Sequence, residues 1–330
     1  MNQIGEFYAR EVYPWLSAAL SWLAAPFPFS LTELLVALLA VVALLLVARL
    51  IFRRGRLKSL RRIVVLLAVT LLWFYAGWGL NYFRNDIYTR LGAFPEPYEE
   101  DLFNEFLEEF AEKLNESWCP PGERTLDMDS FETYVKQFYG DLPSEAGLCK
   151  PRPWQHPKRL TFNRLYSAVG VLGYIGPAFD EMHLNRDMTP LEQPFVFAHE
   201  YSHVLGVSLE AEANFWAFEA CKASPDKAVR YSAWYSLLSF SWNNIRSLTG
   251  EEGFRQWTAT LRSEIIEDMV QVHDHWYALR WSRLSELQGK FYDFFLKTNR
   301  IADGTKNYGQ VLRLVMTFSD FHAHPDGEKD

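Results

Sequence analysis

Residues 199 to 214 read His-Glu-Tyr-Ser-His-Val-Leu-Gly-Val-Ser-Leu-Glu-Ala-Glu-Ala-Asn. The stretch opens with His-Glu-x-x-His, a pattern in which each residue type has a chemical task at its position. Residues four apart lie on one face of a helix, so His199 and His203 can present their imidazoles to the same metal ion. Glu200 lies one step round the helix, where its carboxylate can accept a proton from a water molecule at that ion. The stretch therefore predicts a helical zinc centre with Glu200 as the catalytic base.

The flanking residues predict a buried helix with defined ends. Residues 189–192, Thr-Pro-Leu-Glu, have the pattern of a capping box with proline at the first helical position, and Pro194 is an alternative start. Residues 195–198 are apolar, and two histidines and a glutamate inside a buried helix are costly unless they bind something. Gly206 follows His203 by three residues, where it can end the helix in the left-handed conformation.

A catalytic zinc ion usually has three protein ligands and one water molecule. A second helix is expected to begin near Ser208, with Glu210 at its start and Asn214 four residues later on the same face. We interpret Glu210 as the third ligand and Asn214 as a side chain that orients a ligand. Glu212 is the competing candidate, but its offset of two residues should point it to another side of the helix.

Hydrolysis of a peptide also needs a group that stabilises the oxyanion. His183, Tyr231 and Tyr308 are candidates, and the sequence does not choose among them. Residues 159–185 are the only stretch predicted to form β structure, and residues 180–185 alternate polar and apolar as in an edge strand. Such a strand either pairs with an extended peptide substrate or forms a structural hairpin.

Two apolar runs near the N-terminus predict transmembrane helices, with a pair of buried core helices as the alternative. The first covers residues 31–52, with Glu33 and Arg49 near its ends, and the second covers residues 63–83 and ends in aromatic residues. Residues 53–62 between them contain six basic residues and no acidic one, which predicts a cytoplasmic loop. The rest of the chain, including the His-Glu-x-x-His motif, is then expected outside the cytoplasm.

Three further segments complete the predicted organisation. Residues 1–30 are expected to form an amphipathic extracytoplasmic helix, either on the membrane surface or packed on the soluble domain. Residues 84–322 form the extracytoplasmic domain, and residues 323–330 form a polar tail. Cys119 and Cys149 lie in loop-like regions and a disulfide between them is open, whereas the absence of Cys-x-x-Cys spacing excludes a zinc–thiolate site.

The composition gives no reason to expect a nucleic acid as partner. The chain has 330 residues and a net charge of −8, and it contains no glycine-rich phosphate-binding loop. The expected fold class is mainly α (α+β): two transmembrane helices followed by a zincin-like, mostly helical catalytic domain with a small β element.

With these motifs in place, the chain resembles a family of bacterial membrane proteins of unknown function, DUF3810. The resemblance covers most of the chain and rests on four segments: residues 28–30, residues 78–84, residues 199–215, and residues 296–299 with Tyr308. It implies a zinc peptidase in the bacterial inner membrane. The resemblance implies little about the biochemistry beyond that.

A looser resemblance links residues 210–214 to zinc peptidases whose third ligand is the glutamate of Glu-x-x-Ala-Asp, with Asn214 in place of the aspartate. It gives a second reason to choose Glu210. The tight glycine turn is instead similar to that of metzincin peptidases, whose third ligand is a histidine at the position of Leu209 here. The two likenesses point to different ligand geometries.

The expected function is therefore a membrane-anchored zinc metallopeptidase, with a peptide or protein substrate, Zn²⁺ as cofactor and the lipid bilayer as its surroundings. Glu200 activates the water molecule, and His199, His203 and Glu210 hold the metal. Two alternatives stay open. One is a non-enzymatic envelope protein with a structural or vestigial metal site, and the other is a zinc amidase that acts on cell-wall peptides.

Overall fold

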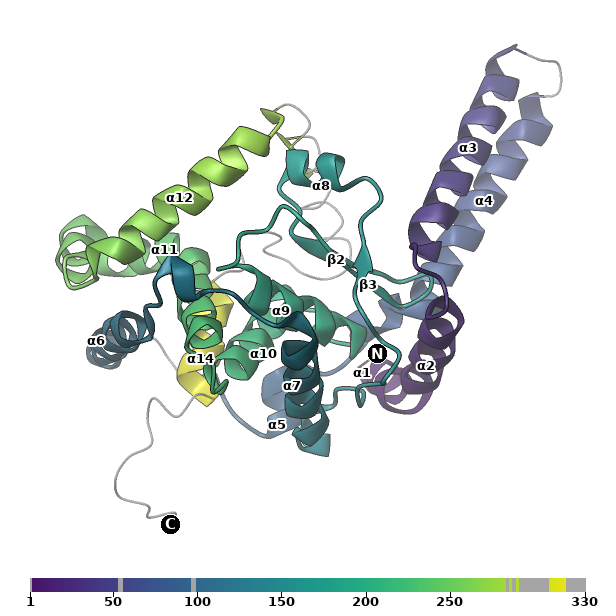
Figure 1. Ribbon diagram of the computed structural model, residues 1–330. Coiled ribbons are helices and arrows are strands. Elements are labelled where there is room, and N and C mark those ends of the chain that lie inside the picture. Colours follow the sequence, from purple (N-terminus) through teal and green to yellow (C-terminus); the bar gives the residue numbers. More distant parts are fainter. Residues whose placement is uncertain are drawn as a thin grey trace.

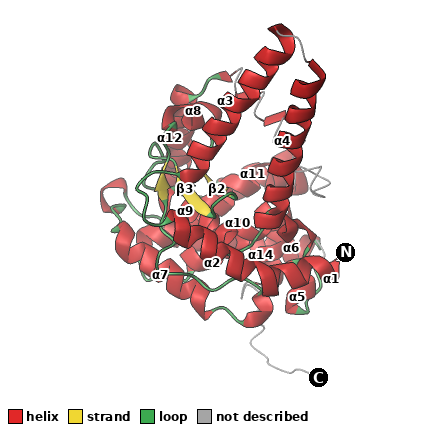
Figure 2. Ribbon diagram, turned by 90° about the vertical axis from the view of Figure 1, so that its right-hand side faces the viewer, coloured by secondary structure: helices red, strands yellow, loops and turns green. Residues whose placement is uncertain are grey.

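The computed structural model of the protein describes residues 2–52, 56–95, 99–282, 285–286, 289–290 and 309–318. This part of the chain is mostly helical, with a small sheet beside the central helices (Figures 1 and 2). The longer helices are α2 (Tyr13–Ala24), α3 (Leu31–Phe52), α4 (Arg56–Gly77), α6 (Glu100–Ser117), α7 (Met128–Asp141), α9 (Gln193–Val204), α10 (Glu210–Lys222), α11 (Lys227–Thr258), α12 (Ser263–Leu279) and α14 (Gly309–Phe318). The short ones are α1 (Asn2–Phe7), η1 (Tyr8–Val12), η2 (Gly79–Phe83), α5 (Ile87–Leu91), η3 (Pro121–Glu123), η4 (Ser144–Ala146) and α8 (Asn163–Val169).

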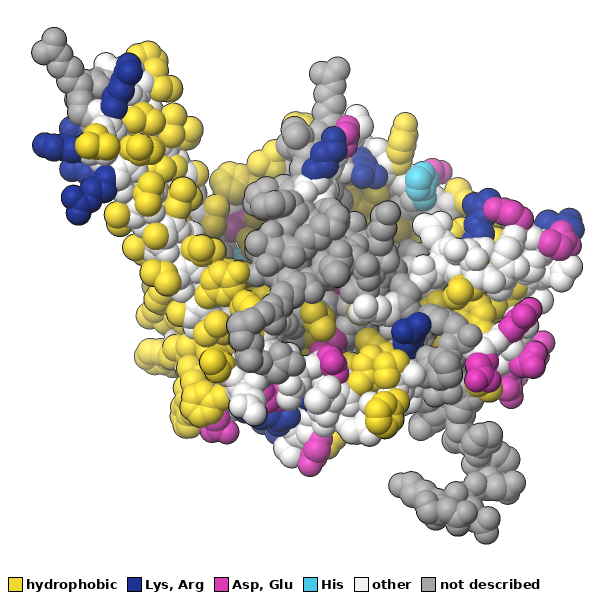
Figure 3. All heavy atoms as spheres, turned by 180° about the vertical axis from the view of Figure 1, so that it is seen from behind, with side chains coloured by type: hydrophobic (Ala, Val, Ile, Leu, Met, Phe, Trp, Pro, Cys, Tyr) yellow, Lys and Arg dark blue, Asp and Glu magenta, His cyan; other side chains and the backbone are white. Residues whose placement is uncertain are grey.

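Helices α3 and α4 form a hairpin that projects from the rest of the molecule (Figure 1). Within the described part of the chain, these two helices are long and apolar enough to cross a membrane, and only 0% and 6% of their most apolar windows are buried. Core helices of a soluble protein would be covered, so the exposure favours contact with lipid. Figure 3 shows hydrophobic side chains over the hairpin and basic ones at its free end.

The second apolar run starts and ends earlier than predicted. Helix α4 begins at Arg56, so four of the six basic residues between the runs lie in its first two turns rather than in a loop. Arginine and lysine are good helix formers, and nothing between residues 56 and 63 breaks a helix. The helix ends at Gly77, and residues 79–83 form the separate 3₁₀ helix η2. Residues 53–55 and the predicted polar tail lie outside the described residues.

The described strands form one small sheet in the order β1–β3–β2, built from β1 (Lys158–Arg159), β2 (Gly173–Gly176) and β3 (Glu181–Leu184). Strand β3 pairs with β1 in parallel and with β2 in antiparallel orientation. The prediction of an edge strand at residues 180–185 is therefore wrong, because β3 is the central strand. Pairing with β1 covers the second edge of β3, and no local sequence pattern indicates that pairing.

Residues 1–30 pack on the domain instead of lying free on a membrane surface. Tyr8 and Tyr13 are buried in the main core, and the Tyr13 hydroxyl donates to the Val204 carbonyl at the end of α9 (2.8 Å). The same core includes Trp78, which follows the second apolar run. The predicted boundary at residue 84 therefore does not separate an anchor from an independent domain.

Candidate metal centre

Helix α9 carries the His-Glu-x-x-His motif and has the ends that its sequence predicts in part. Thr189 donates its backbone N–H to the Glu192 carboxylate (3.0 Å), so the capping pair forms, but it does so on a turn ahead of the helix, which starts at Gln193. At the other end Gly206 has φ 92°, as predicted for a left-handed end. The Gly206 N–H bonds the His203 carbonyl (3.0 Å), and the Val207 N–H bonds the Ser202 carbonyl (3.1 Å).

The glycine turn brings the start of α10 back to the face of α9 that carries the histidines. The Nε2 atoms of His199 and His203 are 3.1 Å apart, and Oε2 of Glu210 lies 3.3 Å from the first and 3.8 Å from the second. In a tetrahedral site with zinc–ligand bonds of about 2.0–2.1 Å, neighbouring ligand atoms are about 3.3–3.4 Å apart. The three side chains therefore fit a zinc ion in chemical type and in spacing.

A backbone carbonyl at the Nδ1 side of the imidazole fixes the orientation of His203. Its Nδ1 lies 2.7 Å from the Val207 carbonyl oxygen, which can only accept, so Nδ1 carries a proton and Nε2 faces the centre, where a bound metal ion would take the place of its proton. Nδ1 of His199 is buried and has no hydrogen-bond partner among the described residues. The glycine turn thus brings Glu210 back to the histidines and also places the Val207 carbonyl that orients His203.

The site is electrostatically suited to a cation. Glu210 accepts hydrogen bonds from both histidines, and these outweigh burial and hold its pKa well below the usual range. Burial alone would lower the pKa of His203, but the hydrogen bond and charge of Glu210, together with the charge of Glu200, raise it to about 9. The carboxylates of Glu200 and Glu210 thus place negative charge beside the two imidazoles in a largely desolvated site. A divalent cation would balance that charge.

Glu200 is buried beside the cluster, and burial raises the pKa of its carboxyl. Its Oε2 has no hydrogen-bond partner among the residues described. Strand β2 lies directly against this side chain: a Cβ at Gly173 would lie 2.7 Å from Cγ of Glu200 and 2.8 Å from its Oε1. Only glycine allows the strand to approach so closely, so Gly173 leaves room for the carboxylate.

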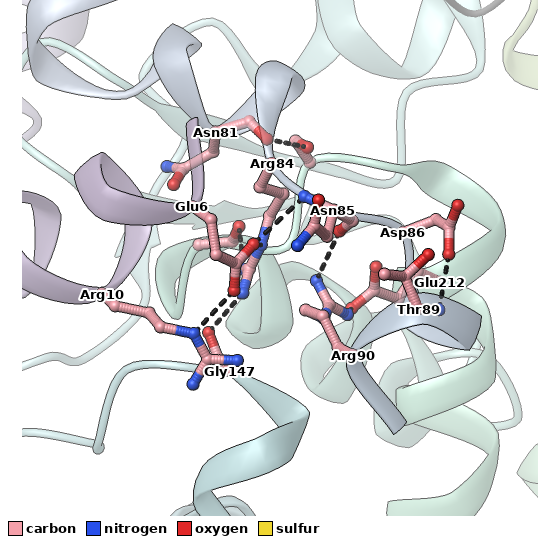
Figure 4. Close-up of polar contacts among 12 residues, drawn as sticks. Glu6, Arg10, Asn81, Arg84, Asn85, Asp86, Thr89, Arg90, Gly147 and Glu212 are labelled. Carbon is pink, nitrogen blue, oxygen red and sulfur yellow. Dashed lines mark hydrogen bonds and ion pairs between the residues drawn. The ribbon is translucent and has the colours of Figure 1, made fainter. Parts of the chain in front are cut away.

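Glu212 points away from the histidines, as its offset from Glu210 predicts. Its carboxylate forms a buried ion pair with Arg90 of α5 and accepts a hydrogen bond from the Trp216 indole (3.1 Å). Figure 4 shows this pair beside Arg84, which donates to the carbonyls of Gly147 (2.6 Å) and Gly206 (3.2 Å). The two glutamates that compete in sequence therefore occupy different environments.

The other predicted residues are not brought to the cluster by any contact in the described structure. Asn214 is buried, but its Oδ1 has no hydrogen-bond partner among the described residues. His183 stacks on Tyr174 and its Nε2 contacts the Ser30 hydroxyl (2.7 Å). Tyr231 donates to Asp268 (2.6 Å). Tyr308 lies outside the described residues.

Sequence reasoning missed the segment after α4 that forms one wall of the centre. The Trp78 indole donates to the His203 carbonyl (3.0 Å), and its ring lies edge-on to the His203 imidazole (6.3 Å between centroids). The charge of Glu210 adds to burial in raising the pKa of Tyr82. The one local signal was a set of polar side chains, Asn81 and Arg84, at the end of an apolar run.

The predicted alternative of a disulfide between Cys119 and Cys149 is not realised. All three cysteines lie in the described part of the chain, and each is a buried free thiol. Burial raises the pKa of Cys149 to about 12, so this thiol is protonated and inert at neutral pH.

Comparison with known proteins places the chain in a family. No curated protein and no solved structure matches it. A family model described as a protein of unknown function (DUF3810) matches residues 8–316, a range that includes α2, the apolar hairpin, the His-His-Glu cluster and most of α14. The protein therefore belongs to the DUF3810 family.

Proposed function

We propose that this protein is a membrane-anchored, zinc-dependent peptidase. One observation carries the proposal: His199, His203 and Glu210 converge at distances that suit zinc, beside a buried carboxylate on the same helix. Two histidines and one glutamate form one of the ligand sets used by catalytic zinc sites, which leave a position open for water or substrate. A closed structural site would need a fourth protein ligand, and the described residues offer none within the same cluster.

A zinc ion held here would supply Lewis acidity and a more acidic water molecule. Glu200 is the group that would accept the proton of that water and deliver it to the leaving amine. Burial raises the pKa of Glu200 toward the neutral range, which suits a side chain that must both take and return a proton. Because Gly173 has no side chain, strand β2 leaves room for the Glu200 carboxylate beside the cluster.

The proposal includes the location. Helices α3 and α4 would span the membrane, in a bacterial cell the inner one, with their basic connection in the cytoplasm. The cluster belongs to the other end of the hairpin, because Trp78 follows α4 and contacts His203. The metal centre would then lie outside the cytoplasm.

The decisive experiment compares the wild type with Glu200→Gln. Both proteins are purified with their hairpin in detergent, and zinc is measured by elemental analysis before peptide-library hydrolysis is assayed. We expect about one zinc per chain in both, and a loss of at least ~10²-fold in hydrolysis in the variant, as for removal of a general base. A wild type that binds no stoichiometric zinc contradicts the proposal. Zinc without hydrolysis of any peptide indicates a structural site.

A further inference from the structure

The hairpin is fixed to the domain at both of its ends there, once through the small sheet and once through a residue of the candidate metal centre, so it is more than a flexible tether. At the start of α3, the Glu181 carboxylate of β3 accepts the backbone N–H groups of Leu31 (3.1 Å) and Thr32 (2.7 Å). After α4, Trp78 donates to the carbonyl of the ligand His203 (3.0 Å). Rigid attachment at two points sets the distance between the centre and the membrane.

Strand β2 lies between the candidate metal centre and the start of α3, so its length limits the distance between them. At one end, Gly173 lies against Glu200 of the centre, and at the other end a Cβ at Gly176 would lie 2.6 Å from the Thr32 hydroxyl. The strand rises about 3.3 Å per residue, so these two contacts are at most about 10 Å apart. Thr32 belongs to the first turn of α3.

The lipid boundary lies within one turn of Thr32. Side chains of α3 become exposed at Leu34 (58%) and stay largely so to Phe52 (81%). At 1.5 Å per residue this stretch is about 28 Å long, which matches a hydrocarbon core of about 30 Å. On α4 the exposed run ends at Trp73, whose indole donates to the Ala178 carbonyl next to β2 (3.3 Å). The centre is therefore at most about 10–15 Å from the hydrocarbon, at or just beyond the outer edge of the headgroup layer, which is about 5–8 Å thick.

A collar of exposed apolar side chains surrounds the base of the hairpin at the same level. Figure 3 shows the hydrophobic surface of the hairpin continuing onto the adjoining domain. Aromatic residues at this depth are typical of a membrane interface. The collar comprises Trp22, Leu23, Phe27 and Phe29 before α3, and Phe162 and Leu165 at the start of α8. The segment that leads into α8 adjoins α3 through the hydrogen bond from the Thr161 N–H to Glu33 (2.9 Å).

From this geometry we infer that the substrate is a polypeptide anchored in the same membrane and cleaved next to its span. The inference rests on the proposed peptidase activity. An extended chain covers about 3.3–3.6 Å per residue, so a peptide bond three to five residues beyond a span reaches a centre 10–15 Å from the hydrocarbon. A protein dissolved in the aqueous phase has to come close to the membrane surface to reach the same place. Anchoring also confines the substrate to the plane in which the enzyme lies.

The first test measures depth and needs no activity. Two cysteine variants are labelled with a fluorophore in phosphatidylethanolamine–phosphatidylglycerol vesicles. Val171→Cys lies beside β2, and Gln137→Cys is an exposed position of α7, a helix that lies away from the hairpin (Figure 1). The native cysteines are buried, so labelling is selective. Nitroxide on the headgroups should quench the probe at residue 171 more strongly than that at residue 137. Equal, weak quenching of both overturns the inference.

The second test measures preference. A randomised octapeptide library is attached to a leucine-rich span either directly or through a twenty-residue helical spacer, about 30 Å long, and is also offered free in solution. Wild-type enzyme in the same vesicles should cleave the directly attached library at least ~10-fold faster than the other two. Equal rates overturn the inference while the peptidase proposal stands. If none of the three is cleaved, the peptidase proposal itself fails, and Glu200→Gln reports any contaminating protease.

Discussion

At the scale of single residues, the two glutamates of α10 provide a matched pair of variants. Glu210→Gln removes the charge that holds the two histidines, so we expect zinc affinity to fall at least ~10-fold with little change in folding. Glu212→Gln leaves Arg90 as an unpaired buried charge, which should destabilise the fold by about 3–5 kcal/mol. Zinc titration and thermal unfolding check both. Loss of zinc in the folded Glu212 variant alone would refute our ligand assignment.

Gly173 offers a second test at the same scale. A methyl group there would collide with the Glu200 side chain, so Gly173→Ala should reduce hydrolysis by displacing the carboxylate, while zinc content stays at that of the wild type. Gly140→Ala is the control, because a Cβ at that helical position meets nothing within 4 Å. It should stabilise α7 by about 0.5–1 kcal/mol and leave hydrolysis unchanged. Equal activity in the two variants would show that Glu200 does not depend on this contact.

At the scale of elements, a buried carboxyl joins α2, the β2–β3 turn and the end of α9. Asp180 lies within hydrogen-bond distance of Tyr13 (3.0 Å) and Ser17 (2.5 Å), and the Tyr13 hydroxyl also reaches the Val204 carbonyl (2.8 Å). One hydroxyl proton cannot serve both of Tyr13's acceptors. A protonated Asp180 supplies the second proton, in agreement with burial raising the pKa of Asp180 to about 7.

The pH dependence of stability follows from that shift. The folded pKa is above the usual aspartate value of 3.8, so the stabilisation by protonated Asp180 is complete below pH 3.8 and is lost as the pH rises through 7. Asp180→Asn mimics the protonated acid and should remove this contribution. We expect its unfolding temperature to fall less than that of the wild type between pH 5 and pH 8. Parallel curves for the two proteins would exclude Asp180 as the titrating group.

The sequence predicts those elements whose causes are local. The C-terminal end of α9, the left-handed Gly206 and the return of Glu210 all depend on neighbours in the chain, and the structure has them where the pattern indicates. The central place of β3 depends on pairing with β1, about 25 residues earlier, and the packing of α2 depends on partners more than a hundred residues away. Residues 163–169, predicted as β, form α8, since Leu165, Ala168 and Val169 also fit a helical spacing.

The candidate metal site follows the same division. The motif and its spacing bring together His199, His203 and Glu210 because all of them lie on α9 and at the start of the helix that follows its glycine turn. The contributions of Trp78 and Gly173 come from segments that only the tertiary fold brings to α9, so no spacing rule reveals them.

At the scale of the whole molecule, the anchor and the domain share one core. Tyr8 and Tyr13 lie in it together with residues of α9 and α10, and Arg84 closes the glycine turn through Gly206. A fragment that begins at residue 85 should therefore lack cooperative unfolding and stoichiometric zinc. Calorimetry and elemental analysis of the fragment check this prediction, and a sharp transition with bound zinc would show that the domain is autonomous.

The contact between Tyr13 and Val204 also sets an order of events during biosynthesis, because 191 residues separate the two partners. At about 5–20 residues per second, the ribosome needs roughly 10–40 s to make the chain between them. Both apolar helices are made early in this interval, and His199 and His203 only at its end. If the hairpin inserts into a membrane as it is made, each new copy would enter that membrane before its candidate metal centre is complete.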